Sequence, residues 1–288
     1  MYFLLKLLAL LPLRVLHFLG YLIAWVLIQT PSSIQRITRI NIQLAYPELK
    51  PAAQEAMVRA SIHSQCLSYL ECIKFWGMSP EYSLSKIKNI QGVKHLENAL
   101  NEKHGVIVIV PHLGSWELLN AWLCQQAQPM IMYKPNKNGQ INRYILEARQ
   151  KTNAVLVPAN ESGVRAIFKH LKQGGLTVIL PDHLPKPSGG IYTDFFKQNV
   201  LSGTIVSKLA QKTQCNVIGL SCIRTKRLSY FDIHCSSVSN DIMSKDIQTG
   251  VLCLNQHMEQ LIAAAPAQYI WSYKRFRNCY GNHNPYRA

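Results

Sequence analysis

The sequence has few acidic residues for its length. Of its 288 residues, 15 are Asp or Glu and 31 are Lys or Arg, which gives a formal net charge of +16. Such an excess favours a polyanionic partner, such as nucleic acid, anionic lipid or an acidic protein. No zinc-finger, RNA-recognition or basic-zipper signature is present, and the basic residues are scattered from Lys6 to Arg287. Nucleic acid is therefore not expected as a partner.

The eight cysteines lack the spacing of a disulfide framework or a zinc site. No C-x-x-C pair occurs, and no cysteines and histidines have finger-type spacing, so no metal site is predicted. Most of the cysteines lie in apolar runs, which indicates buried free thiols and a reducing compartment. Internal repeats and low-complexity runs are also absent. We therefore expect one domain, residues 31–288, after a distinct N-terminal segment.

That N-terminal segment is the most apolar part of the chain. A cleaved signal peptide is not favoured, because the apolar run continues to Ile28 without a small-residue cleavage site. We expect one membrane-associated helix over residues 1–30, with Lys6, Arg14 and His17 in one narrow polar stripe. The stretch after Arg14 covers only about 21 Å at 1.5 Å per residue, so the helix either spans the bilayer or lies in its interface plane.

Two arginines follow this helix directly, at positions 36 and 39. Positive charge next to a membrane segment favours the cytoplasmic side. The remainder of the chain is therefore expected on the cytoplasmic face of a membrane, where its basic surface would meet anionic lipids.

The rest of the sequence alternates between strand and helix patterns, which predicts an α/β fold: a mostly parallel sheet flanked by helices. Two helices come first, over residues 34–46 and 51–76. The candidate strands are Val106–Val110, Met130–Tyr133, Ala154–Val157, Thr177–Leu180, Asn216–Ile223 and Tyr230–His234. The candidate helices between and after them are Trp116–Gln126, Gln140–Lys151, Ser162–Lys172, Gly203–Thr213 and Thr249–Ala264.

His112 and Glu117 form the most informative pair. His112 follows the buried strand Val106–Val110, and Glu117 lies in the first turn of the next helix, for which Ser115 is a good N-cap. Ligands of open α/β sheets bind at this edge. A carboxylate that holds one ring nitrogen leaves the other as a base near neutral pH. The alternative is a buried histidine satisfied by a carbonyl, with the glutamate only complementing the helix dipole.

Other candidate site residues follow further along the chain. Asp182 also stands at the carboxyl end of a strand, where it either positions a ligand or caps a turn. The cations Lys134, Arg149 and Arg165 lie after the His112 strand, and we expect one or two cations of this region to contact a phosphate. The aromatic and basic tail over residues 271–277 either sits at a lipid interface or packs back on the domain.

Taken together, the chain resembles the bacterial late acyltransferases of lipid A biosynthesis, within the lysophospholipid acyltransferase superfamily. The resemblance covers nearly the whole length. It rests on an ordered set of segments: the apolar N-terminus, NIQLAYPEL from Asn41, HLGSWE from His112, YKPN from Tyr133 with Arg149, LPD from Leu180, and YIWSYKRF from Tyr269. The glycerophosphate branch usually carries Phe-Pro-Glu-Gly-Thr-Arg where this chain has Leu-Pro-Asp-His, which favours the lipid A branch.

The resemblance implies a bacterial inner-membrane enzyme with residues 31–288 as its acyltransferase domain. It implies that His112 and Glu117 are the catalytic pair, that acyl-carrier protein donates the acyl group as a thioester co-substrate without another cofactor, and that a lipid A precursor accepts it. The residues leave three alternative functions open. The first is an acyltransferase for another acceptor, such as a lysophospholipid or other glycolipid. The second is a thioesterase, and the third is a non-catalytic anionic-lipid-binding protein. A G-x-S-x-G motif is absent, so we expect direct transfer to an acceptor hydroxyl rather than a covalent serine intermediate.

Overall fold

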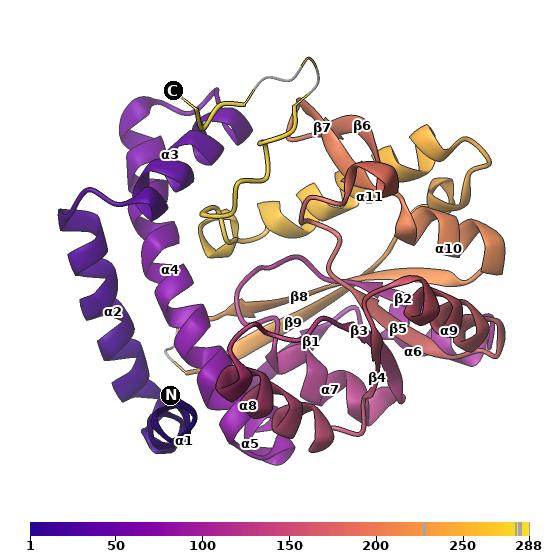
Figure 1. The fold of residues 1–288 in the computed structure, drawn as a ribbon, viewed down its shortest axis with the longest axis horizontal. Coiled ribbons are helices and arrows are strands. Elements are labelled where there is room, and N and C mark those ends of the chain that lie inside the picture. Colours follow the sequence, from indigo (N-terminus) through magenta and orange to yellow (C-terminus); the bar gives the residue numbers. More distant parts are fainter. Residues whose placement is uncertain (227–228, 280, 282–283, 288) are drawn as a thin grey trace.

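A seven-stranded sheet with helices on both faces forms the centre of the molecule (Figure 1). The computed structural model describes residues 1–226, 229–279, 281 and 284–287. The strand order is β1-β9-β8-β2-β5-β3-β4. Only β8 and β9 pair antiparallel, and every other pair in this sheet is parallel. The predicted α/β fold with a mostly parallel sheet is confirmed.

The strands of this sheet are β1 (Ile87–Gln91), β2 (Val106–Ile109), β3 (Pro129–Tyr133), β4 (Val155–Pro158), β5 (Leu176–Ile179), β8 (Asn216–Arg224) and β9 (Phe231–Ser237). A separate antiparallel hairpin consists of β6 (Gly190–Phe195) and β7 (Gln198–Gly203). The α-helices are α1 (Tyr2–Leu10), α2 (Leu13–Gln29), α3 (Ser33–Ala45), α4 (Pro51–Gly77), α5 (Pro80–Leu84), α6 (Val93–Asn101), α7 (Leu118–Gln126), α8 (Gly139–Gln150), α9 (Glu161–Lys172), α10 (Ile205–Thr213) and α11 (Ile247–Ala263). Short 3-10 turns occupy Pro187–Gly189, Asn240–Met243 and Pro266–Gln268.

The β-branched run of β2 lies in the middle of the sheet, between β5 and β8, and all four of its residues are buried. Its side chains alternate between two hydrophobic cores, as strand geometry requires. Ile107 and Ile109 join the core beneath α9, α10 and α11. Val106 and Val108 join the core beneath α6 and α7. Both faces of β2 are therefore covered, which fixes the strand that carries His112.

The C-terminal tail packs back on the domain. Trp271 and Phe276 are among the largest fully buried side chains and belong to the core beneath α9, α10 and α11. The side-chain amide of Asn41 in α3 donates to the backbone carbonyls of Trp271, at 2.5 Å, and of Tyr273, at 2.7 Å. Of the two alternatives for residues 271–277, packing against the domain is the one that the structure shows.

The single N-terminal helix predicted over residues 1–30 is wrong in one respect, because the chain forms two helices there. α1 and α2 meet at an angle of 118° across the break at Leu11 and Pro12. Pro12 lacks an amide hydrogen and cannot continue the helix. The buried ammonium of Lys74 donates to the carbonyls of Ala9 and Leu11, which the break leaves without helical partners. Lys6, before the bend, pairs with Glu147 of α8, whereas the buried His17, after the bend, pairs with Glu71 of α4, so the predicted polar stripe does not form.

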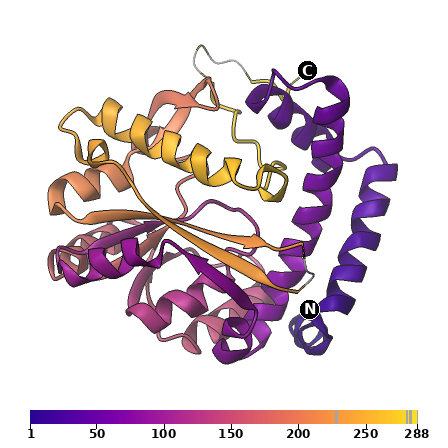
Figure 2. The same cartoon turned by 180° about the vertical axis from the view of Figure 1, so that it is seen from behind.

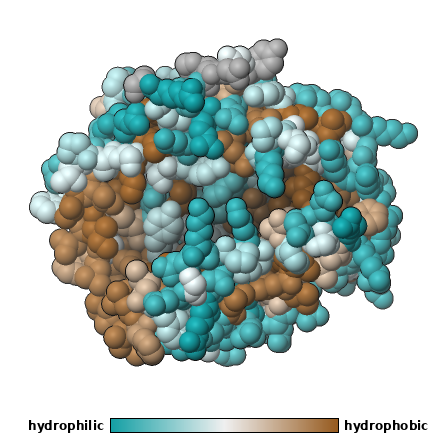
Figure 3. All heavy atoms as spheres, viewed as in Figure 1, coloured by the Kyte–Doolittle hydropathy of each residue, from teal (hydrophilic) through white to brown (hydrophobic). Residues whose placement is uncertain are grey.

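The two N-terminal helices expose most of their apolar side chains. Of the fifteen large apolar side chains that are exposed in the described residues, twelve belong to residues 1–26. We call these twelve the N-terminal apolar surface; they include Phe18, 68% exposed, and Trp25, 57% exposed. In Figure 3 apolar residues gather over the end of the molecule that α1 and α2 occupy in Figure 1. Within the described residues no single helix is long and apolar enough to cross a membrane, whereas the bent pair α1 and α2 meets that criterion jointly.

Candidate active site

His112 stands on a short segment that is fixed from two sides. The amide of Val110 still donates to Ile179 of β5 at 3.1 Å, and Pro111 then ends the strand. The carbonyl of His112 accepts a hydrogen bond from the amide of Ile270 at 3.0 Å. Two residues further on, the amide of Gly114 donates to the carbonyl of Gln268 at 3.0 Å. The segment 268–270 is thereby hydrogen-bonded to the residues that follow β2.

Gly114 allows this segment to turn. Its φ is +57°, and a Cβ at this position would lie 2.1 Å from the carbonyl oxygen of Cys222. Only glycine tolerates both the left-handed conformation and this close approach. The amide of Ser115 then donates to the same carbonyl at 2.9 Å. The turn therefore depends on contact with β8, the neighbour of β2 in the sheet.

The carboxylate that holds His112 belongs to Asp182, not to Glu117 as predicted. Asp182 follows β5, which lies beside β2. Its Oδ1 is 2.8 Å from Nδ1 of His112, and its Oδ2 accepts the backbone amide of His112 at 2.9 Å. The Asp182 side chain has no exposed area, whereas 20% of the His112 side chain is exposed. Asp182 thus fixes both the backbone and the ring of His112.

This pairing shifts the pKa values of both groups. Burial would lower the pKa of His112, but the charge and hydrogen bond of Asp182, with a smaller contribution from Glu117, raise it above 6.5. Burial would raise the pKa of Asp182, yet the charge and hydrogen bond of His112 hold it well below its usual range. Asp182 is therefore ionised at neutral pH. Its Oδ1 accepts a hydrogen bond from Nδ1–H of His112, which leaves Nε2 of a neutral ring with its lone pair.

No hydrogen bond to Nε2 of His112 occurs in the described part of the chain. The ring is held instead by aromatic contacts. The His183 ring stacks on it at a centroid distance of 4.0 Å and an angle of 2°, and Tyr273 stacks on His183 at 3.9 Å. Trp116 meets His112 edge-on at 5.4 Å. The ring thus has a fixed plane and one nitrogen available to a ligand.

His183 does not compete with His112 for a proton. Desolvation and the charge of His112 lower the pKa of His183 to about 4. It is therefore neutral at pH 7 and serves as a flat support beneath the His112 ring. Tyr273 holds the far side of the stack, and its hydroxyl accepts the amide of Leu184 at 3.0 Å.

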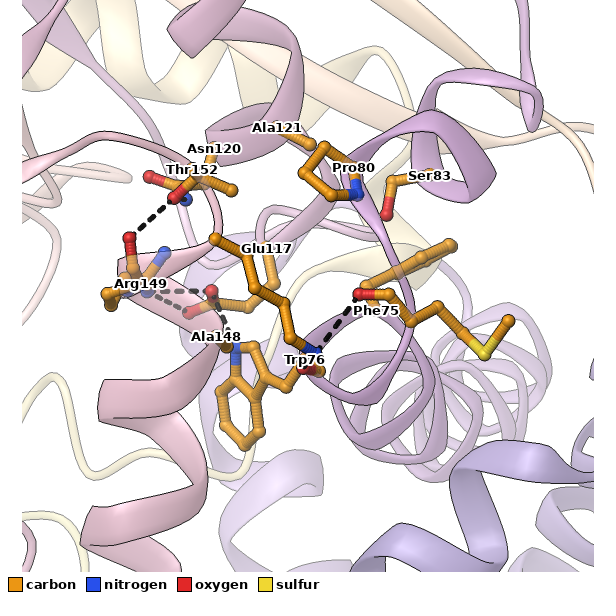
Figure 4. Close-up of a pocket in the computed structure, with 12 residues that line it drawn as sticks. Phe75, Trp76, Pro80, Ser83, Glu117, Asn120, Ala121, Ala148, Arg149 and Thr152 are labelled. Atoms are coloured by element: carbon orange, nitrogen blue, oxygen red, sulfur yellow. Dashed lines mark hydrogen bonds and ion pairs between the residues drawn. The ribbon is translucent and has the colours of Figure 1, made fainter.

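Glu117 pairs with Arg149 instead of His112. Its two oxygens lie 2.7 and 3.0 Å from Nη2 of Arg149, and Trp76 donates to it through Nε1 at 2.9 Å (Figure 4). These partners come from α8 and α4. The turn after Gly114 directs Glu117 toward those helices, while His112 remains at the strand end. The contribution of Glu117 to the pKa of His112 is through its charge, not through a hydrogen bond.

The helix after His112 starts later than predicted. α7 begins at Leu118, its N-cap is Glu117, and no side chain caps it. Ser115 is buried, and its hydroxyl forms no hydrogen bond in the described residues, so the expected capping by Ser115 is wrong. The backbone amides of Trp116 and Glu117 likewise have no acceptor within the part of the chain that the structure describes. Two amides next to His112 are thus available to an anion.

The structure does not bring the remaining predicted cations to His112. Lys134 is exposed after β3, and Arg165 is exposed on α9, where it lines a groove beside α10. Arg149 is the only one of the three predicted cations that reaches Glu117. Residues 112, 117, 149 and 182 therefore form one cluster, which contains two separate carboxylate pairs.

Sequence reasoning missed three residues that pack around this cluster. Trp76 lies in the long helix α4 and carries no local signal of its role. His183 is adjacent to Asp182, and its position after a strand end was a usable signal. Tyr273 lies in the aromatic tail, whose contact with the site depends on the return of the chain to the sheet edge.

Comparison with known proteins places the chain in one family. A family model described as bacterial lipid A biosynthesis acyltransferase matches residues 1–278. The chain is 24% identical over 269 residues to a lipid A biosynthesis palmitoleoyltransferase of Escherichia coli, covering 93% of this chain and 86% of that protein. It is 21% identical over 268 residues to a lipid A biosynthesis lauroyltransferase of Escherichia coli, covering 93% and 87%. A phosphatidylinositol mannoside acyltransferase of Mycolicibacterium smegmatis is 24% identical over 179 residues, covering 60% and 58%.

Proposed function

Because the chain belongs to the bacterial lipid A biosynthesis acyltransferase family and is an acyltransferase, we propose that it moves a fatty acyl group from acyl-carrier protein to a hydroxyl of a lipid A precursor. The observation that carries this proposal is the pairing of His112 with Asp182. One ring nitrogen is bound to a buried carboxylate, and the other is available at the carboxyl end of a central strand. This is the arrangement of a general base.

In the proposed reaction, Nε2 of His112 removes the proton from the acceptor hydroxyl. The hydroxyl oxygen then attacks the thioester carbonyl of the donor. A new ester bond forms as the carbon–sulfur bond breaks, and the proton on Nε2 passes to the leaving thiolate. Asp182 stabilises the imidazolium that exists between these two steps. Glu117 forms no hydrogen bond with His112. It adds a negative charge near the His112 ring and fixes the guanidinium of Arg149.

The tetrahedral intermediate of this reaction carries a negative oxygen, which needs hydrogen-bond donors. The backbone amides of Trp116 and Glu117 lie next to His112 and have no acceptor in the described residues. Arg149 is less suitable, because Glu117 already occupies its guanidinium. We assign the two amides to the oxyanion. Direct transfer is favoured over a covalent intermediate, since the hydroxyl of Ser115, three residues from His112, is buried and forms no hydrogen bond in the described residues.

The N-terminal apolar surface supports attachment to a lipid bilayer. A contiguous exposed surface of this kind is rare on soluble proteins and marks an interaction site. The bent pair α1 and α2 suits insertion into the interface, where the basic chain meets anionic lipids. In a bacterial cell the bilayer would be the inner membrane, and the acyltransferase domain would lie on its cytoplasmic face. Attachment there places His112 in the same compartment as both the donor and a lipid acceptor.

Replacing His112 with alanine tests the proposal. The purified protein is incubated with labelled acyl-carrier protein and a lipid A precursor, and products are identified by mass spectrometry. We expect the transfer rate of His112→Ala to fall by roughly 10²–10⁴ while vesicle binding is unchanged. His104→Ala, at an exposed histidine outside the cluster, serves as the control. Full transfer activity in His112→Ala would contradict the assignment.

The acceptor is tested in the same assay with a panel of lipids. One relative is a phosphatidylinositol mannoside acyltransferase, so another glycolipid or a lysophospholipid is the second candidate acceptor. An acylated lipid identifies the acceptor. Release of free fatty acid alone indicates a thioesterase, and no turnover with any lipid favours a non-catalytic lipid-binding protein.

A further inference from the structure

A groove between α9 and α10 has a volume of about 640 Å³. Its walls are apolar side chains from both helices: Val164 and Phe168 on one side, Ile205 and Leu209 on the other. Three cations also line the groove. They are Arg165 of α9 and Lys208 and Lys212 of α10.

The three cations of the groove share their exposure and their lack of partners among the described residues. All three are exposed, and none forms an ion pair or a side-chain hydrogen bond within the described residues. Lys208 and Lys212 are four residues apart and so lie on the same face of α10. No acidic residue is among the described residues that line the groove. An apolar floor with a rim of one charge sign is complementary to an amphipathic helix whose polar face is acidic.

The position of the groove favours a soluble partner over a lipid. α9 and α10 lie at one end of the longest axis of the molecule, and α1 and α2 lie at the other (Figures 1 and 2). When the N-terminal apolar surface contacts a bilayer, the groove faces away from it. A protein that diffuses in water can reach this end of the molecule.

The groove is also connected to the candidate active site. Gly189 lines it, and the carbonyl of Gly189 accepts hydrogen bonds from the amide and the hydroxyl of Thr204, at 3.0 and 3.2 Å. Gly189 is seven residues from Asp182. Seven residues span at most about 25 Å, so the groove lies within reach of a long prosthetic arm that extends to His112.

We propose that this groove docks an acidic helix of the acyl-carrier protein that delivers the thioester. The proposal rests on the proposed function for the identity of the donor and adds the surface that receives it. Carboxylates of the carrier pair with Arg165, Lys208 and Lys212, and its apolar side chains fill the floor around Phe168. The carrier is then held beside the sheet edge while its acyl chain reaches His112.

The test compares two double variants of the full-length protein. Lys208→Glu/Lys212→Glu reverses two charges of the groove. Lys88→Glu/Lys94→Glu reverses two exposed charges on β1 and α6, near the opposite edge of the sheet, and gives the same net charge. Binding of fluorescent, acyl-loaded carrier protein is measured by anisotropy at several salt concentrations, and melting temperatures verify that both variants are folded.

We expect the groove variant to bind the carrier about tenfold more weakly or worse, and its KM for the carrier to rise with little change in kcat. The affinity of the unaltered protein and of the control variant should fall as salt rises, and that dependence should weaken in the groove variant. Equal binding by both double variants overturns the proposal. So does loss of binding to phosphatidylglycerol vesicles, with unchanged carrier binding, in the groove variant.

The proposed function and the docking site fail in different ways. Acyl transfer by the unaltered protein, with carrier binding that ignores the groove charges, removes the docking site and leaves the function. Groove-dependent carrier binding without any lipid product supports the docking site and removes the function. Absence of carrier binding by the unaltered protein overturns both.

Discussion

Two carboxylates lie close to His112, and they differ in their hydrogen-bond partners. Asp182 binds Nδ1 and the backbone amide of the same residue, and it has no exposed side-chain area. Glu117 is paired with Arg149 and Trp76 and influences His112 only through its charge. The orientation and the basicity of the His112 ring therefore depend first on Asp182.

Replacing Asp182 with asparagine should change the pH profile as well as the rate. The base must be neutral, so activity rises with pH through the His112 pKa, which lies above 6.5. Without the aspartate charge, burial lowers that pKa, and the acidic limb of the kcat profile should move to lower pH. We also expect kcat to fall by roughly 10²–10⁴. The profile is measured by single-turnover transfer at a series of pH values.

Glu117→Gln is the matched comparison for this experiment. Glu117 contributes least among the causes that set the His112 pKa, so the limb should move less than in Asp182→Asn. The reverse order, with the larger shift in Glu117→Gln, would mean that Glu117 is the partner of His112 during the reaction.

How far these residues could be predicted follows from what sets their positions. His112 and Asp182 were both recognisable, because each follows a buried strand and strand ends carry sites. Their pairing was not, since it requires β2 and β5 to be neighbours in the sheet, although 70 residues separate the two side chains. Glu117 is five residues from His112, yet the turn at Gly114 directs it elsewhere. Proximity in sequence was the wrong guide to the contact.

At the scale of elements, a buried network attaches α2 to the rest of the fold. Glu71 of α4 accepts bidentate hydrogen bonds from Arg224 of β8, at 2.6 and 2.8 Å, and lies 2.8 Å from Nε2 of His17 in α2. All three side chains are nearly inaccessible to solvent. Removal of one partner would leave a buried charge without compensation.

Glu71→Gln should therefore lower the free energy of unfolding by about 3–5 kcal/mol, measured by urea denaturation. Burial alone would raise the pKa of Glu71, but Arg224 and His17 lower it from 4.5 to about 2. A lowered pKa in the folded state means that the stabilisation exists above pH 4.5 and is lost as pH falls toward 2. The difference between the two proteins should accordingly shrink over that interval.

Glu55→Gln provides the control, because Glu55 pairs with Arg39 at a site where both side chains are more than a third exposed. Such a pair contributes at most about 1 kcal/mol. Equal destabilisation by Glu55→Gln and Glu71→Gln would show that burial of the network has no energetic consequence.

The elements themselves were predicted with uneven success, for physical reasons. The six strands with apolar runs and the helices between them were found, since burial in a sheet with two covered faces leaves a clear pattern. β1 was missed because four of its five residues are exposed at the sheet edge. The predicted single helix over residues 1–30 was wrong because the apolar pattern outweighed Pro12, which ends α1.

For the whole molecule, the dominant feature is the separation of an apolar end from a basic groove. Twelve exposed apolar side chains gather on Met1, α1 and α2, and three exposed large apolar side chains lie elsewhere in the described residues. The groove between α9 and α10 lies at the far end of the longest axis. One molecule can thus meet a lipid surface and a soluble protein at the same time.

Membrane attachment can be weakened without touching the site. Phe18→Glu/Trp25→Glu places two charges on the N-terminal apolar surface, where each side chain is more than half exposed. Loss of apolar burial in lipid should reduce co-sedimentation with vesicles of phosphatidylethanolamine and phosphatidylglycerol by about tenfold or more.

Ile90→Glu/Val155→Glu introduces the same charge at exposed apolar residues of β1 and β4. Vesicle binding should be retained in this control. If both double variants co-sediment equally well with vesicles, α1 and α2 do not form the attachment surface.

The hydrogen bonds that join Gln268 and Ile270 to the His112 segment also determine the order in which parts of the molecule form during synthesis. The N-terminal helices leave the ribosome first, whereas the bonds that fix His112 cannot form until the chain has been synthesised past Ile270. The ring stack requires Tyr273 as well. A nascent chain therefore exposes its apolar helices before the contacts that hold the His112 ring are complete, so the membrane attachment and the general base proposed above would become available in that order.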